Sequence, residues 1–387
     1  MIKYLDLKAV NEPYEHAADE VLRSGWYLRG EATHRFEQHY AEYIGTKHCV
    51  GCANGLDALT LILRAYKDLG QLKDGDEVIV PANTYIATIL SITENALVPV
   101  LVEPSIDTLQ IDDSLIEQAI TPKTRALMIV HLYGRCAYTA RIGDICRRHG
   151  LLLIEDNAQA HGCLSACAAT VLQPRHTGSL GHAAAHSFYP TKNLGAFGDA
   201  GAVTTDDDEL ADMVRALGNY GSARHYVFDH LGRNSRLDEL QAAILDAKLP
   251  HLDAANARRR EIAAIYINNV KHPDIVIPNN HNSNVPFTPL SLPLHSPYTP
   301  QIPNNVYHIF PILSPRRDEL RQYLLDNGVQ TEIHYPIPPH RQRCYSAWNT
   351  LSLPVTERIH REELSLPCNP AMTDEEASHV VSLLNKF

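Results

Sequence analysis

The 387-residue sequence contains no apolar run that approaches the length needed to cross a bilayer, which is about 20 residues. It also lacks basic runs: 45 Asp and Glu residues outnumber 34 Lys and Arg residues, and the net charge is −11. Such a balance disfavours binding to nucleic acid or to an anionic membrane surface. The first residues, Met1 to Leu7, lack the long apolar stretch of a signal peptide. We therefore expect a cytoplasmic protein.

Cysteine is sparse, with 8 residues scattered along the chain, which excludes a small scaffold held by disulfides. The only CxxC pattern runs from Cys49 to Cys52, and no second pair lies at the spacing of a zinc site. Small buried residues at a strand end explain this pair better than redox chemistry does. Three histidines, His176, His182 and His186, crowd one region without forming a recognised metal motif. We expect no metal site.

What the sequence does contain, between His48 and Thr205, is an alternation of short apolar runs with helical stretches. Most of these runs show no period-2 alternation, which is typical of strands buried on both faces of a largely parallel sheet. The intervening stretches, such as Arg141 to His149, then serve as crossover helices. The predicted strands are 77–81, 98–102, 126–132, 151–154, 183–188 and 201–205. The pattern predicts an α/β fold.

The regions on either side of this alternation differ from it. Up to about Gly45 the sequence predicts two helical pieces separated by a turn. A helix over 252–269 is predicted to link a large domain, 1–250, to a smaller C-terminal α+β domain, 251–387. In that C-terminal part we expect strands at 306–312 and 331–335, a helix at 316–327, a final helix capped by Thr373, and a Pro- and Asn-rich loop or arm at 281–305.

Two stretches carry polar groups where the predicted strands end. The apolar strand at 151–154 is followed by Glu155 and Asp156, and ligands of open α/β sheets bind at the carboxyl ends of strands. Asp156 could ligate magnesium, cap a helix or pair with a ring nitrogen. Asn54 and Gly55 lie between a strand and a helix, where backbone N–H groups can approach an anion. The glycine spacings of Walker and dinucleotide-binding loops are absent.

A third stretch places Lys192 between a small apolar run and a glycine-rich loop that leads to the strand at 201–205. At the mouth of a sheet its amine can be desolvated and act as a nucleophile. Pyridoxal phosphate requires such a lysine for its Schiff base, an acid that keeps the ring nitrogen protonated, and a phosphate cradle. Lys192, Asp156 and the Gly55 turn supply these three groups. We therefore predict that Lys192 carries this aldehyde cofactor covalently.

Three motifs, Glu155–Gly162, Ser187–Gly195 and Gly232–Ala243, resemble the signatures of the DegT-like nucleotide-sugar aminotransferases. These are fold-type I pyridoxal phosphate enzymes, and the similarity runs from about Ile2 to the C-terminus. The resemblance implies a large, mostly parallel seven-stranded sheet domain and a smaller C-terminal α+β domain. It also implies pyridoxal 5′-phosphate as the cofactor, held as an internal aldimine on Lys192.

The resemblance further assigns roles residue by residue. It implies that Lys192 and Asp156 are catalytic and that Asn234 reaches the cofactor phosphate of a neighbouring subunit, in a homodimer with shared active sites. A local turn cap is the alternative for Asn234. The other implied cofactor contacts are Gly55, Leu56, Tyr85, Gln159 and Ser187. The implied substrate contacts are Tyr189, Tyr220, His334 and Tyr335, and burial in the core is the alternative for each tyrosine.

Gly25–Gly30, Gly218–Gly221 and the loop with Tyr189 look most like the branch that aminates C3 of dTDP-3-keto-6-deoxyhexoses. The implied reaction uses L-glutamate and yields dTDP-3-amino-3,6-dideoxyhexose, a precursor of surface polysaccharides such as O-antigen or of glycosylated metabolites. One alternative is a 4-aminotransferase acting on a UDP- or dTDP-4-keto-6-deoxyhexose. Another is a non-catalytic sensor with the same fold. The chain departs from the family pattern at 163–173 and 281–305, which leaves the sugar site less defined than the cofactor site.

Overall fold

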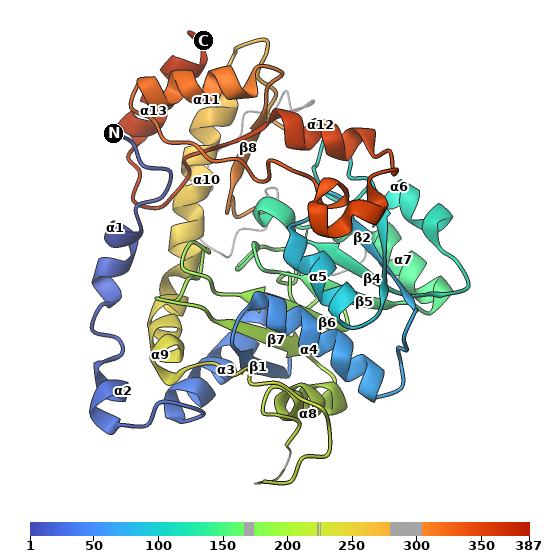
Figure 1. Cartoon of the computed structure of the whole chain (residues 1–387). Coiled ribbons are helices and arrows are strands. Elements are labelled where there is room, and N and C mark those ends of the chain that lie inside the picture. Colours follow the sequence, from blue (N-terminus) through green and yellow to red (C-terminus); the bar gives the residue numbers. More distant parts are fainter. Residues whose placement is uncertain (166–173, 223, 225, 279–303) are drawn as a thin grey trace.

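The computed structural model describes residues 1–165, 174–222, 224, 226–278 and 304–387. Most of the predicted loop at 163–173 and of the arm at 281–305 therefore lies outside the described residues. The centre of the fold is a seven-stranded sheet with the order β1-β7-β6-β5-β4-β2-β3 (Figure 1). Its strands are β1 (His48–Cys52), β2 (Glu77–Pro81), β3 (Val98–Val102), β4 (Thr124–Val130), β5 (Leu152–Asp156), β6 (Ala183–Ser187) and β7 (Gly201–Thr205).

The sheet is mostly parallel, as predicted. Neighbouring strands from β3 to β6 pair in parallel, and only β7 runs antiparallel to its two neighbours, β6 and β1. Each of the six strands predicted between residues 77 and 205 is present, with ends that differ from the prediction by at most two residues, whereas the strand predicted at 306–312 is the shorter β8 (Phe310–Leu313). Parallel strands need crossover connections, and α7 (Ala140–His149) makes the one between β4 and β5. The α/β fold class is confirmed.

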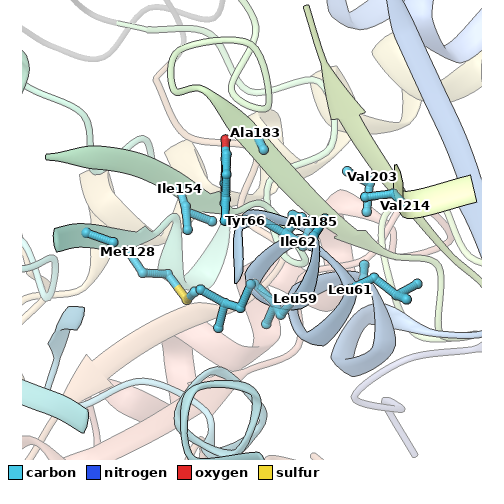
Figure 2. Close-up of a cluster of buried hydrophobic side chains, with 14 of the residues drawn as sticks. Leu59, Leu61, Ile62, Tyr66, Met128, Ile154, Ala183, Ala185, Val203 and Val214 are labelled. Atoms are coloured by element: carbon cyan, nitrogen blue, oxygen red, sulfur yellow. The ribbon is translucent and has the colours of Figure 1, made fainter. Parts of the chain in front are cut away.

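Both faces of the sheet are covered, which explains why its strands lack alternation in the sequence. In β4, Met128 belongs to a hydrophobic cluster with Leu59 and Ile62 of α4 (Gly55–Asp68), as Figure 2 shows. Its neighbour Leu127 points to the opposite face and belongs to a cluster with α7. Residues 126–130 of this strand are all apolar because each of them is buried. The sheet therefore holds its edges rigidly in place.

Further helices surround this sheet and continue into the C-terminal part. On the N-terminal side three helices form where two were predicted, α1 (Leu7–Asn11), α2 (Asp19–Ser24) and α3 (Glu31–Ile44). The remaining α-helices are α5 (Ile86–Glu94), α6 (Asp113–Ile116), α8 (Asp208–Leu217), α9 (Glu239–Lys248), α10 (Leu252–Asn269), α11 (Arg317–Asp326), α12 (Pro354–Glu362) and α13 (Asp374–Leu384). Short 3-10 helices are η1 (Glu12–Tyr14), η2 (Glu117–Ala119), η3 (Leu132–Gly134), η4 (Leu249–His251), η5 (Pro339–Arg341) and η6 (Arg343–Trp348).

A second hydrophobic core lies in the C-terminal part, where α10, α11 and α13 pack with a two-stranded sheet. In that sheet β8 (Phe310–Leu313) pairs antiparallel with β9 (Glu363–Leu366). Ile2 bridges to Val329 and packs against this core, so the start of the chain joins the C-terminal part. On these grounds we propose that the chain divides near residue 250.

The C-terminal predictions are met unevenly. The capping box at Thr373 is confirmed, because its hydroxyl accepts from the N–H of Glu376 and the Glu376 carboxylate accepts from the N–H of Thr373. The strand predicted at 331–335 is wrong. That segment makes a single bridge, between Glu332 and Ser365 of β9, and then reaches Pro336, which has no N–H to continue a ladder. This segment nevertheless lies beside β9, which matters for the site.

Candidate active site

Asp156 is the last residue of β5 and stands at the carboxyl edge of the parallel strands. Its carboxylate is buried and accepts hydrogen bonds from Thr88 Oγ1, at 2.8 Å, and from the N–H of Ala158, at 3.1 Å. Burial raises the pKa of Asp156 above its ordinary value, although these bonds and the charge of Lys192 act to lower it. A buried carboxylate that its own chain satisfies only in part is suited to a cationic partner in the crevice.

Lys192 lies in the turn that follows β6, where its N–H donates to the carbonyl of Tyr189 at 2.8 Å. Burial lowers the pKa of the Lys192 amine to about 8, and the charge of Asp156 opposes this shift. Near neutral pH about a tenth of the amine is therefore unprotonated, far more than for an exposed lysine. The predicted nucleophile and the predicted acid lie close enough for their charges to interact, and the amine is poised for attack on a carbonyl carbon.

The N-terminus of α4 meets the end of β6 beside these two residues. Asn54 caps the helix, with its Oδ1 accepting from the N–H of Asp57 at 2.9 Å. A Cβ placed on Gly55 would come within 2.5 Å of Ser187 Cβ, so only glycine permits this approach. The first N–H groups of a helix have no partners within the helix and carry partial positive charge. Together with the Ser187 hydroxyl they make a cradle that fits a phosphate group.

The C-terminal part contributes a second side to the site through His334 and Tyr335. Gln159 Nε2 donates to the hydroxyl of Tyr335 at 3.0 Å, and Gln159 Oε1 accepts from the N–H of Tyr133 at 2.6 Å. The ring of Tyr335 lies 5.0 Å from that of Tyr85, which stands just before α5 and is half exposed. Burial lowers the pKa of His334 to about 4, and the charge of Lys192 adds to the effect. These contacts bring predicted residues of separate segments together.

Three predicted site residues lie further out on the surface. Tyr189 is 50 % exposed, directly before the turn that holds Lys192. Asn234 is exposed and sits in a segment that bridges to Asn219, next to Tyr220. The contacts described for Asn234 and Tyr220, which include the guanidinium of Arg236 at 5.4 Å from the Tyr220 ring, do not reach Lys192 or Asp156.

The structure also brings to the site residues that sequence reasoning missed. Thr88 lies within the segment that includes Tyr85, but its bond to Asp156 spans 68 residues. His161 follows Gln159 by two positions and is buried with no hydrogen-bond partner for either ring nitrogen among the described residues. Burial, with the charge of Lys192, lowers the pKa of His161 to about 3. The Gln159-Ala-His161 spacing was a visible signal for His161, whereas no local pattern marks Thr88.

The described residues form neither a metal centre nor a membrane-spanning helix. Within the described ranges, no group of three or more His, Cys, Asp and Glu side chains is placed to hold a metal ion. Cys49 and Cys52 are both buried as free thiols. No helix in the described part of the chain has the length and hydropathy that crossing a membrane requires.

The chain is similar to known proteins over nearly its whole length. Residues 9–385 match the DegT/DnrJ/EryC1/StrS aminotransferase family. Over 391 residues the chain is 47 % identical to the dTDP-3-amino-3,6-dideoxy-alpha-D-galactopyranose transaminase of Aneurinibacillus thermoaerophilus, covering 100 % of this chain and 99 % of that protein.

Two solved structures are similar over nearly the whole chain. One is DesV of S. venezuelae in complex with a ketimine intermediate, with a TM-score of 0.88 and 41 % identity, covering 100 % of this chain and 98 % of that one. The other is NtdA of Bacillus subtilis with bound cofactor PMP, with a TM-score of 0.81 and 30 % identity, covering 96 % and 80 %. The predicted family is confirmed: this chain belongs to the DegT/DnrJ/EryC1/StrS aminotransferase family.

Proposed function

We propose that this chain is a pyridoxal 5′-phosphate-dependent 3-aminotransferase of nucleotide sugars. It transfers the amino group of L-glutamate to a dTDP-3-keto-6-deoxyhexose and yields dTDP-3-amino-3,6-dideoxyhexose. The observation that carries the proposal is the meeting of Lys192, Asp156 and the N-terminus of α4 at one edge of the sheet. The 47 % identity to a dTDP-3-amino-3,6-dideoxygalactose transaminase supports the choice of substrate class.

The residues of the crevice fit the cofactor. The N–H groups of Gly55 and Leu56 and the hydroxyl of Ser187 would hold its phosphate, because the lack of a Cβ at Gly55 lets the helix N-terminus approach Ser187 closely. Asp156, buried with a raised pKa, would pair with the ring nitrogen and gain the cationic partner that the chain itself does not supply. The cofactor, when bound, supplies an electron sink for the substrate carbon.

The remaining steps belong to side chains of the crevice. Lys192 would hold the aldehyde carbon of the cofactor and, once displaced by an amino donor, move a proton at the substrate carbon. Its pKa of about 8 suits this task, because the amine can accept and return a proton near neutral pH. Tyr85 and Gln159 would flank the cofactor ring. Tyr189, His334 and Tyr335 would contact the hexose. Both half reactions use one pocket, so the kinetics should be ping-pong.

The proposal includes a homodimer in which Asn234 reaches the cofactor phosphate of the other subunit and Tyr220 lies near its substrate. In support, Asn234 is exposed and Tyr220 is 47 % exposed. Large apolar side chains such as Trp26, at 65 % exposed, and Leu231, at 83 % exposed, suit coverage by a second copy. Light scattering coupled to size-exclusion chromatography tests this, and a monomer that turns over at full rate would contradict it.

The decisive experiment gives the purified protein L-glutamate with either a dTDP-3-keto- or a dTDP-4-keto-6-deoxyhexose and identifies the product by mass spectrometry and NMR. Amination at C3 is expected, and amination at C4 alone would establish the alternative. Borohydride reduction followed by peptide mapping should place the cofactor on Lys192. The Lys192→Ala variant should lose turnover completely while keeping the wild-type melting temperature. An adduct on another lysine would refute the site.

A further inference from the structure

Strand β9 is buried along its whole length, yet its residues alternate in chemistry. Leu364 and Leu366 belong to the C-terminal hydrophobic core, whereas Glu363 and Ser365 point to the opposite side. A carboxylate and a hydroxyl that are both fully buried need hydrogen-bond partners. They find them in the segment that ends at His334, which β9 meets through the bridge between Glu332 and Ser365.

Three contacts connect these residues into one chain of hydrogen bonds. Glu363 Oε2 accepts from the N–H of His334 at 2.7 Å, and Glu363 Oε1 lies 2.5 Å from Ser365 Oγ. Ser365 Oγ in turn lies 2.8 Å from Nδ1 of the His334 ring. Among the described residues Nε2 of that ring has no hydrogen-bond partner. The His334 ring lies close enough to Lys192 for the lysine charge to act on it.

The position of a single proton decides the direction of these bonds, because the Ser365 hydroxyl has one hydrogen to donate. When Glu363 is ionised, Ser365 donates to its carboxylate and accepts from Nδ1–H, which leaves a lone pair on Nε2 of His334. When Glu363 is protonated, it donates to Ser365, which then donates to Nδ1, and the ring proton resides on Nε2. The hydrogen bond at one ring nitrogen fixes the state of the other.

We propose that Glu363 and Ser365 are positioning residues that set which ring nitrogen of His334 carries the proton. They thereby set whether His334 offers a donor or an acceptor to the bound nucleotide sugar. The statement about the nucleotide sugar rests on the proposed function. The hydrogen-bonded chain from Glu363 through Ser365 to His334, called the relay below, is a property of the protein itself. Keto and phosphate oxygens only accept hydrogen bonds, so the Nε2–H form is the one that binds them.

The surroundings of Glu363 place this change close to neutral pH. Burial raises the pKa of Glu363 to about 8, against the lowering effects of Ser365, the His334 N–H and the charge of Arg317. Arg317 donates to the backbone carbonyl of Glu363 and not to its carboxylate. The titratable and charged groups that face Glu363 are Arg317, His334, Tyr4, Tyr133 and Tyr335. Burial raises the pKa of each of these tyrosines, so the hydroxyls stay neutral throughout.

The test uses holoenzyme with ¹⁵N-labelled histidine rings and reads the tautomer of His334 from long-range ¹H–¹⁵N correlation spectra. His334→Asn identifies the signals by their loss. In the wild type, the Nε2–H form at low pH should give way to the Nδ1–H form with a midpoint near pH 8. Glu363→Gln should keep the Nε2–H form at every pH, because its amide N–H donates to Ser365 as the protonated carboxyl does. Ser365→Ala should uncouple the tautomer from pH.

The matched control is Glu357→Gln, which removes a carboxylate from a different histidine, His340, whose Nε2 lies 3.0 Å from it. This variant should titrate like the wild type. A His334 tautomer that does not change with pH in the wild type overturns the proposal, as does an unchanged titration in Glu363→Gln. If Glu363→Gln does not fold, a wild-type titration of the His334 tautomer in Ser365→Ala overturns the proposal instead.

Kinetics test whether the tautomer of His334 affects binding of the nucleotide sugar. One pH unit above its pKa, Glu363 is about 90 % ionised, so the wild type retains about a tenth of the donor form. Relative to its value at pH 7, kcat/KM for the keto-sugar at pH 9 should be about tenfold higher in Glu363→Gln than in the wild type. Identical pH profiles of kcat/KM for the wild type and Glu363→Gln overturn the statement about the nucleotide sugar. The spectra need no substrate, so a failure to aminate any 3-keto sugar, which would sink the proposed function, leaves the relay testable.

Discussion

The two sides of strand β5 present neighbouring buried carboxylates that the molecule treats differently. On one side Glu155 accepts hydrogen bonds from His131 Nε2 at 2.8 Å and from the backbone N–H groups of Gly178, Leu180 and Gly181. Burial acts to raise the pKa of Glu155, but these donors outweigh it and hold the pKa below its ordinary value. On the other side Asp156 has two donors, and burial prevails.

On this contrast we expect Glu155 to be structural and Asp156 to be functional. The carboxylate of Glu155 finds its hydrogen-bond donors within its own chain and holds the segment before β6 to the sheet. It is therefore not available to a ligand. Asp156 is left short of partners at the edge where Lys192 and the α4 N-terminus meet. A buried titratable group with an unmet need for charge is typical of a functional site. Exchanging each acid for its amide is therefore the most direct way to break the comparison.

The largest effect is expected for Asp156→Asn. The amide cannot hold a cationic ring nitrogen, so turnover should fall on the order of 10³-fold, the scale seen when a preorganised electrostatic contact is lost. Stability of the cofactor-free protein should be unchanged or higher, because a partly satisfied buried charge has been removed. Steady-state kinetics and thermal melting measure the two effects. A variant that melts far below the wild type would show that Asp156 is structural after all.

Glu155→Gln should have the reverse profile. An amide oxygen accepts where the carboxylate accepted, but the NH₂ group faces donors, so at least one of four buried donors loses its partner. The free energy of unfolding should fall by about 3 kcal/mol. The rate per folded molecule should stay within a few-fold of the wild type. Urea unfolding measures the first quantity, and activity normalised to the folded fraction measures the second. A stable, inactive Glu155→Gln would contradict the assignment.

The sheet could be predicted from the sequence, and the site proposed at its edge rests on patterns in the same sequence. Continuous apolar runs predicted the buried strands, and the rule that ligands bind at the carboxyl ends of strands predicted Asp156 before any contact was known. Lys192 and Gly55 were found because each lies in a local pattern, a lysine before a glycine loop and a glycine at a helix start. These inferences needed only neighbours in the chain.

Partners from distant segments could not be predicted in this way. Nothing near Glu155 in the sequence indicates that His131 and residues 178–181 will surround it. The bond from Tyr133 to the carbonyl of His334 spans 201 residues. The strand predicted at 331–335 failed for the same reason, because β9, a distant segment, offers it only a single bridge. Tertiary contacts give Glu155 its full set of donors and leave Asp156 with two.

The pH dependence of stability sharpens the comparison between Glu155 and Asp156. Glu155 has a folded pKa below its ordinary value of 4.5, so its stabilising contribution is present above pH 4.5 and is lost as the pH falls through the folded pKa. Asp156 has a folded pKa above 3.8, so its contribution is present below pH 3.8 and is lost as the pH rises through the folded pKa.

Urea unfolding of the cofactor-free protein across this range should therefore separate the two variants. The deficit of Glu155→Gln relative to the wild type should shrink in acid, where the wild type loses the Glu155 contribution. The stability of Asp156→Asn relative to the wild type should instead rise as the pH increases. Parallel pH curves for both variants and the wild type would remove the contrast between the acids.

The smallest expected effect on turnover comes from removing one of the two hydrogen-bond donors of Asp156. Thr88 Oγ1 donates to Asp156 Oδ2 at 2.8 Å and also lies 2.8 Å from the hydroxyl of Thr84. Thr88→Val keeps the shape and removes the donor, so the pKa of Asp156 should rise further and turnover should fall about fivefold, as expected for one hydrogen bond of about 1 kcal/mol. Thr88→Ser keeps the hydroxyl and should remain within twofold of the wild type, on the same scale. Equal rates for the valine and serine variants would mean that Asp156 depends on its cationic partner alone, and that its few donors are not what sets it apart from Glu155.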